Sequence, residues 1–95
     1  MVIYEVNLVI SGNIYPEFQL WLKKHVKEIV QIQGFVQASI LKPENDKISD
    51  FEKLTVQYLL ENREYLNVYF MEFAAKMREE GIKLFKDKFS ADRRI

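Results

Sequence analysis

Residues 2–10, Val-Ile-Tyr-Glu-Val-Asn-Leu-Val-Ile, determine the expected fold. The even positions are all apolar, whereas the odd positions combine two apolar residues with Glu5 and Asn7. This period of two predicts a β-strand with one wholly apolar face. Such a face is expected where helices cover one side of a sheet. The turn-forming residues 11–13, Ser-Gly-Asn, follow and end the strand.

In the rest of the chain, the spacing of apolar residues predicts two helices and three further strands. Pro16 suits the first turn of a helix that runs to about Gln33, and Gly34 suits its C-terminal end. A second helix begins after Asn62, a plausible N-cap, and Gly81 is expected to end or bend it. Further strands are expected at Phe35–Lys42, Lys53–Leu60 and Phe89–Ile95, with a polar loop at Pro43–Glu52.

The order strand-helix-strand-strand-helix-strand predicts an α+β, ferredoxin-like βαββαβ fold. One antiparallel sheet would carry two helices on one face. With 95 residues, the whole chain (1–95) is expected to form a single domain. In the second strand, Val36, Ala38 and Ile40 are expected to face the helices, and Phe35 is expected on the opposite face.

Composition excludes several classes of protein. Fourteen basic residues balance fourteen acidic ones, which argues against a nucleic-acid partner. We do not expect a zinc site, because the sequence contains no cysteine and only one histidine. The sequence also lacks the glycine-rich motifs that bind phosphate groups. We therefore expect no metal and no cofactor. The apolar start is too short to cross a bilayer and has no signal-peptide flanks, which leaves the cytoplasm, with no membrane partner, as the expected location.

The face of the sheet away from the helices carries the functional prediction. It mixes apolar side chains with polar ones, a pattern that suits a second sheet packed around a partly polar cavity. The simplest partner is a second copy of the chain, so we expect a homodimer with a small-molecule site between its sheets. The candidate ligand-binding residues are Glu5, Asn7, Trp21, Gln37, Ser39, Gln57 and Arg93.

Each candidate also has a purely structural interpretation. His25 is the candidate catalytic base, because its ordinary pKa lies near neutrality, but it could equally be a hydrogen-bonded core residue. Glu5 and Asn7 could form a polar network across the dimer. The other neutral polar groups could be cross-strand pairs. Arg93 and its neighbour Arg94 could clamp a carboxylate or phosphate, or protect an exposed edge strand.

Several segments resemble a known family. The helix segment Trp-Leu-Lys-Lys-His at 21–25, Gly34-Phe35, and the segment Glu-Asn-Arg-Glu-Tyr-Leu at 61–66 resemble the DUF4286 family of uncharacterised bacterial proteins. So do residues 3–7 and 89–94. The chain also resembles the wider dimeric α/β-barrel superfamily, which contains antibiotic-biosynthesis-monooxygenase-like proteins.

The resemblance implies a dimeric α/β barrel and cofactor-free monooxygenase or isomerase-like chemistry. From the mixed face of the sheet, we expect His25 to act as base in such a reaction and Asn7, Gln37 and Ser39 to orient the substrate. Haem-degrading relatives place an asparagine on the first strand, as Asn7 is here. Their tryptophan and histidine, however, do not both lie on the first helix, as Trp21 and His25 do. A non-catalytic dimeric regulatory or protein-interaction module is the alternative function.

Overall fold

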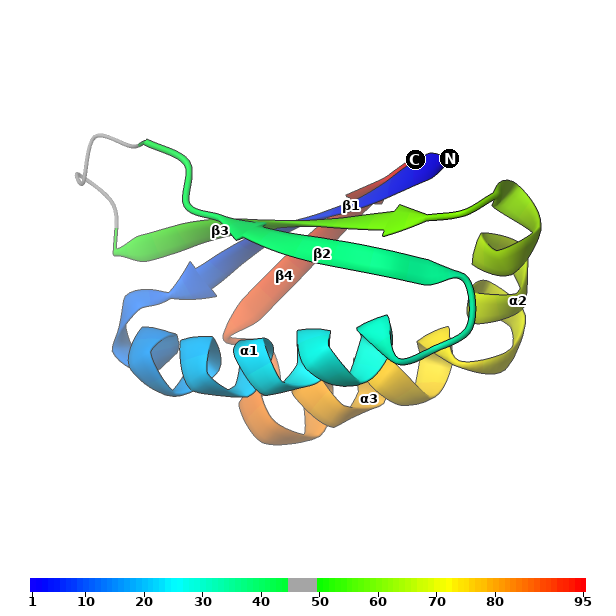
Figure 1. Cartoon of the computed structure of the whole chain (residues 1–95). Helices are drawn as coiled ribbons and strands as arrows, with labels where there is room; N and C mark the ends of the chain where they lie inside the picture. Colours follow the sequence, from blue (N-terminus) through cyan, green and yellow to red (C-terminus); the bar gives the residue numbers. More distant parts are fainter. Residues whose placement is uncertain (45–49) are drawn as a thin grey trace.

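The computed structural model describes residues 1–44 and 50–95. These residues form four strands, three α-helices and one short 3-10 turn in an order that fits a ferredoxin-like fold, with the second helical region divided in two (Figure 1). The strands are β1 (Val2–Ser11), β2 (Phe35–Leu41), β3 (Phe51–Leu60) and β4 (Phe89–Arg94). The helices are α1 (Tyr15–Val30), α2 (Arg63–Glu72) and α3 (Ala74–Phe85), and the 3-10 turn η1 spans Gly12–Ile14.

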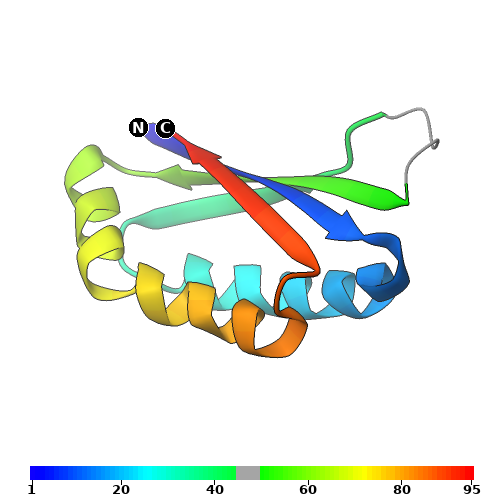
Figure 2. The ribbon, with the colours of Figure 1, turned by 180° about the vertical axis from the view of Figure 1, so that it is seen from behind.

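The sheet is antiparallel throughout, with the strand order β2-β3-β1-β4. It is an open sheet whose edges are β2 and β4. All three helices lie on one side of it, as Figures 1 and 2 show from opposite directions. The other side, called the open face below, is covered by no described part of the chain. The α+β, ferredoxin-like prediction is therefore confirmed.

The hydrophobic core lies between the helices and the sheet. The even positions of β1 and β3 supply Tyr4, Leu8, Val56 and Tyr58, and α1 supplies Phe18, which is fully buried. Alternation along each strand therefore separates the core from the open face, as the sequence predicts. Asn62 caps α2, because its Oδ1 accepts a hydrogen bond from the Tyr65 amide at 3.0 Å.

Several element details differ from the prediction. A bulge between Phe35 and Gln37 shifts the register of β2, so Phe35 lies opposite Leu60 on the helix side and not on the open face. There its ring packs edge-on against Tyr58 and Tyr69. Helix α1 ends at Val30, before Gln33, and β3 begins at Phe51, inside the predicted loop. Residues 45–49 of that loop lie outside the described residues.

The second helical region also differs. The break between α2 and α3 falls at Phe73, whose φ of −123° leaves the helical range, and not at Gly81. Gly81 lies inside α3 and is buried. A β-carbon there would come within 2.8 Å of Cη2 of Trp21, so the absent side chain makes room for the indole of α1. Two helices can therefore pack closely above the sheet.

Candidate functional site

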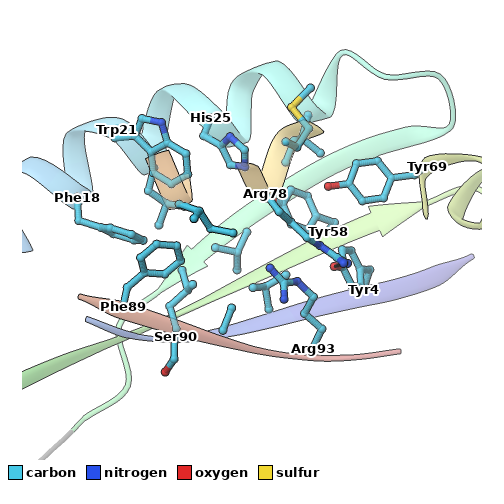
Figure 3. Close-up of a pocket in the computed structure, with 18 of the residues that line it drawn as sticks. Tyr4, Phe18, Trp21, His25, Tyr58, Tyr69, Arg78, Phe89, Ser90 and Arg93 are labelled. Carbon is cyan, nitrogen blue, oxygen red and sulfur yellow. Dashed lines mark hydrogen bonds between the residues drawn. The ribbon is translucent and has the colours of Figure 1, made fainter. Parts of the chain in front are cut away.

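A cavity of about 250 Å³ lies between the sheet, α1 and α3. Figure 3 shows it from the side, with α1 above and the strands below. Its interior is mostly aromatic and aliphatic, which is the usual character of a small-molecule site. The lining residues are Tyr4, Val6, Leu8, Phe18, Trp21, Leu22, His25, Ile29, Val56, Tyr58, Tyr69, Met77, Arg78, Ile82, Lys86, Phe89, Ser90, Ala91 and Arg93.

Helix α1 places Trp21 and His25 side by side over the cavity. They are four residues apart and therefore project from the same helix face. Their rings stack with centroids 4.4 Å apart and an angle of 22° between the planes. Both rings point from α1 toward the sheet (Figure 3). Phe18 and Phe85 pack against the indole, which fixes its position in the roof.

The His25 imidazole is held in a neutral state by its surroundings. Only 10% of the side chain is exposed, and this burial lowers the pKa of His25, while the Glu80 carboxylate partly opposes that effect. Nδ1 lies 3.5 Å from Oε2 of Glu80, at the limit for a hydrogen bond, and has no well-formed bond to any described residue. A carboxylate beside Nδ1 favours the tautomer that carries its proton there, which leaves Nε2 unprotonated.

Three tyrosines line the cavity on the side of the sheet and of α2. The rings of Tyr4 and Tyr58 stack at 5.8 Å, and Tyr69 contacts Tyr4 at 6.1 Å. Burial raises the pKa of Tyr69 to about 12 and raises that of Tyr58 as well, so both phenols stay protonated at neutral pH. Arg78 of α3 donates a hydrogen bond from Nη2 to the Tyr4 hydroxyl at 3.3 Å. The cavity therefore holds neutral hydroxyl groups beside a fixed cation.

The last strand sends its two arginines to opposite sides of the sheet. Arg93 lies opposite Val6 and lines the cavity, where Figure 3 shows its side chain rising toward Arg78. Arg94 lies opposite Glu5, and its Nε donates to Oε2 of Glu5 at 2.6 Å. One arginine of the pair therefore belongs to the cavity and the other to the open face.

Glu5 is the centre of a polar network on the open face. Its carboxylate accepts hydrogen bonds from Asn7 at 3.0 Å, from Gln57 at 3.0 Å and from Arg94. Thr55 extends the network by donating to the amide oxygen of Asn7 at 2.8 Å. These bonds, led by the one from Asn7, lower the pKa of Glu5 to about 2. The network is thus internally satisfied in the ionised state.

The predicted site residues divide between the two faces. Trp21, His25 and Arg93 line the cavity on the helix side. The other five lie on the open face: Glu5, Asn7, Gln37, Ser39 and Gln57. The sheet separates the open-face group from His25, so within one chain these residues do not surround a common ligand. A ligand site between the sheets of two copies stays a prediction.

Sequence reasoning missed the strongest polar feature of the cavity, Arg78, and also its tyrosines. A signal for Arg78 exists, since it falls within the sheet-facing stripe of α3 formed by Ala74, Met77 and Gly81. A cation in such a stripe usually marks a polar opening in the core. The tyrosines alternate with aliphatic residues in the strands, and that pattern alone does not distinguish a filled core from a cavity.

The described parts of the chain contain neither a metal-binding cluster nor a helix that could cross a membrane. Residues 1–44 and 50–95 contain no cluster of three or more side chains placed to bind a metal ion. Within the same residues, none of the helices has the length and apolar character needed to cross a membrane.

Solved structures with the same fold cover almost the whole chain. An EthD family protein from Bacillus halodurans C-125 has a TM-score of 0.68 at 12% identity, covering 100% of this chain and 98% of its own. A variant of SnoaB, a cofactor-independent oxygenase from Streptomyces nogalater, has a TM-score of 0.68 at 10% identity, covering 97% and 87%. A dimeric ferredoxin-like protein from an uncultured marine organism has a TM-score of 0.65 at 14% identity, covering 97% and 92%.

At these identities the likeness shows the fold alone, which is the ferredoxin-like architecture. No curated protein matches the sequence significantly. One family model does match, and it spans residues 1–95. Its description is "Domain of unknown function (DUF4286)". The chain therefore belongs to the DUF4286 family.

Proposed function

We propose that the cavity between the sheet and the helices binds a small organic molecule. The observation that carries the proposal is the stacked Trp21–His25 pair, which roofs a cavity of about 250 Å³. An apolar interior with a few polar groups at defined positions is typical of ligand sites. His25 adds a neutral imidazole whose Nδ1 has no well-formed hydrogen bond to the described residues.

The reaction we propose is cofactor-free oxygenation or isomerisation of that molecule. His25 would remove a proton from an acidic C–H group, because its lowered pKa keeps it neutral and able to accept a proton. In an isomerisation the proton returns to another carbon. In an oxygenation the substrate carbanion reduces molecular oxygen and forms a C–O bond to it. The protonated peroxide then breaks its O–O bond, so that one oxygen atom stays on the substrate as a carbonyl and the other leaves as water. SnoaB, which shares the fold, is described as a cofactor-independent oxygenase, and this supports the proposal by analogy.

The open face is proposed to join two copies of the chain. Ile3 and Leu41 are 51% and 44% exposed there, around the satisfied network of Glu5. Apolar side chains surrounding a closed polar network suit an interface between two sheets. A solved structure with the same fold is described as a dimeric ferredoxin-like protein, and this supports a dimer by analogy. The dimer would leave both helix-side cavities outside the interface.

Ligand binding can be read at one residue, because Trp21 is the only tryptophan in the sequence. We would label it as 5-fluorotryptophan and screen small organic compounds by ¹⁹F NMR. A hit should shift the Trp21 resonance in the wild type and not in Ala91→Leu, which fills the cavity from β4. Ala75→Leu, on the exposed side of α3, is the matched control and should bind normally. Equal binding by both variants would place the ligand elsewhere.

Catalysis is tested separately with the compounds that bind. Oxygen uptake or product formation should be lost in His25→Gln, while ¹⁹F-detected binding persists. Binding without turnover in the wild type would favour the alternative, a non-catalytic dimeric regulatory or protein-interaction module.

The dimer is tested by light scattering after size-exclusion chromatography. Ile3→Lys places a charge on the open face and should give a monomer. Val68→Lys, at a similarly exposed position on α2, should leave the mass unchanged. A wild-type monomer at micromolar concentration would contradict the proposed assembly.

A further inference from the structure

Three cationic residues border the helix-side cavity, and none of the carboxylates in residues 1–44 and 50–95 does. Arg78, Lys86 and Arg93 are among its lining residues, whereas no described aspartate or glutamate is. The chain as a whole contains equal numbers of acidic and basic residues. The absence of acidic side chains from this lining is therefore a local property of the cavity and not a consequence of composition.

The three cations are also left without ionic partners. Among the described residues, ion pairs involve Lys42, Lys83, Arg94 and His25, and none involves the three cavity cations. Within the described residues, the Arg78 side chain makes one hydrogen bond, to the hydroxyl of Tyr4. Glu80 faces His25 and is not a lining residue. Like charges brought together without counter-ions create a positive potential that attracts an anion.

The charged and the apolar lining residues of the cavity are separated: the charged ones lie at its opening to solvent and most of the apolar ones in its interior. Arg78, Lys86 and Arg93 are exposed residues, whereas Phe18 and Leu22 are buried and Trp21 is only partly exposed. The side chains of Arg78 and Arg93 extend toward the same region beside Tyr4 in Figure 3, and both also line a smaller hollow next to that residue. A ligand would therefore place its apolar part beneath Trp21 and its charged part at the two arginines.

We infer that the ligand of this cavity is a small aromatic acid, with its ring beneath Trp21 and its carboxylate between Arg78 and Arg93. This inference rests on the proposed function and adds the chemical class of the ligand. Guanidinium groups suit the assignment because they bind carboxylates through paired, charge-assisted hydrogen bonds. The hydroxyl of Tyr4 is a further donor next to Arg78.

Pairs of compounds that differ only in charge test the inference. We would titrate benzoate against benzamide, and 2-naphthoate against 2-naphthamide, into protein labelled with 5-fluorotryptophan. The carboxylates should bind about tenfold or more tightly than the amides, and added sodium chloride should reduce the difference. Arg93→Met should remove about the same factor for the carboxylate and change amide binding little.

Arg93 is the better first variant because no described side chain depends on it for a hydrogen bond, whereas Arg78 also holds Tyr4. Arg93→Lys keeps the charge and should recover part of the affinity. Arg63→Met, on the exposed surface of α2, is the matched control and should bind like the wild type.

The possible outcomes separate this inference from the proposed function. Equal binding of acids and amides would overturn the aromatic-acid assignment and leave the small-molecule site intact. If Arg93→Met and Arg63→Met weaken the binding of acids equally, the assignment is also overturned. The affinity for acids would then reflect only the net charge of the protein. If neither series shifts the Trp21 resonance at millimolar concentration, the aromatic-acid inference fails, whereas the proposed function is refuted only if the wider compound screen also finds no ligand of the cavity.

Discussion

Replacing Gly81 by alanine should destabilise the protein, although the same change stabilises most helices. In a helix interior, alanine is favoured over glycine by about 1 kcal/mol. Here the new β-carbon would lie 2.8 Å from Cη2 of Trp21. Carbon atoms pack best at about 3.5–4.0 Å, so the indole tip must move by about 0.7–1.2 Å.

The indole has little freedom to make that movement. Its rings already contact Phe18, Phe85 and the His25 imidazole. Overpacking of this kind costs about 1–3 kcal/mol. After subtraction of the helix-propensity gain, the loss of unfolding free energy is about 0–2 kcal/mol. For a domain of this size, a loss of about 1 kcal/mol lowers Tm by about 4–8 °C.

The assay is thermal unfolding followed by circular dichroism, together with Trp21 fluorescence in the native state. Combining Gly81→Ala with Trp21→Phe removes the clashing atom, so in that background the alanine should stabilise by about 1 kcal/mol. A rise in Tm in the single variant would refute the reasoning. So would an equal effect of Gly81→Ala in both backgrounds, because the clash with the indole would then contribute nothing.

Three further predictions concern pH and the backbone. Burial lowers the pKa of His25 in the folded state, so the neutral imidazole contributes fully to stability above the ordinary pKa of 6.5 and this contribution is lost as the pH falls below that value. The Tm should therefore fall less between pH 8 and pH 5 in His25→Gln than in the wild type. The pKa of Glu5 is about 2 against an ordinary 4.5, so Glu5→Gln should lower the urea midpoint at neutral pH, and the difference from the wild type should disappear between pH 4.5 and 2. Gly34 has φ of 93° and its added β-carbon would overlap Tyr65, so Gly34→Ala should cost about 2–4 kcal/mol by urea unfolding. Tyr65→Ala should remove the steric part of that cost and leave the backbone part.

Period and alternation in the sequence were sufficient to predict the two layers of this fold and the order of its strands and helical regions along the chain. They also indicated the side of β1 and β3 that faces the helices. The bulge before Gln37 was not predictable, because one extra residue reverses the side on which Phe35 lies while leaving a strand-like pattern. The break at Phe73 likewise has no glycine or proline to mark it.

The position of the cavity was harder to predict than the residues around it. Alternation assigned Tyr4 and Tyr58 to the core, but whether a core is filled depends on how side chains from separate helices meet. The cavity exists where Trp21 packs against Gly81 and where Arg78, not an aliphatic residue, faces the sheet. Those contacts join distant parts of the chain, and the periodicity of a single sequence does not reveal them.

The alternation of β4 has a consequence for how the two faces influence each other. Arg93 and Arg94 share one peptide bond but lie on opposite sides of the sheet. The pairing of Arg94 with Glu5 holds the same backbone that carries Arg93 into the cavity. A contact that strengthens this ion pair would therefore act on the strand next to Arg93. If such a contact changes the affinity of a ligand at Arg93, thermodynamic reciprocity requires that ligand to change the contact on the open face by the same free energy.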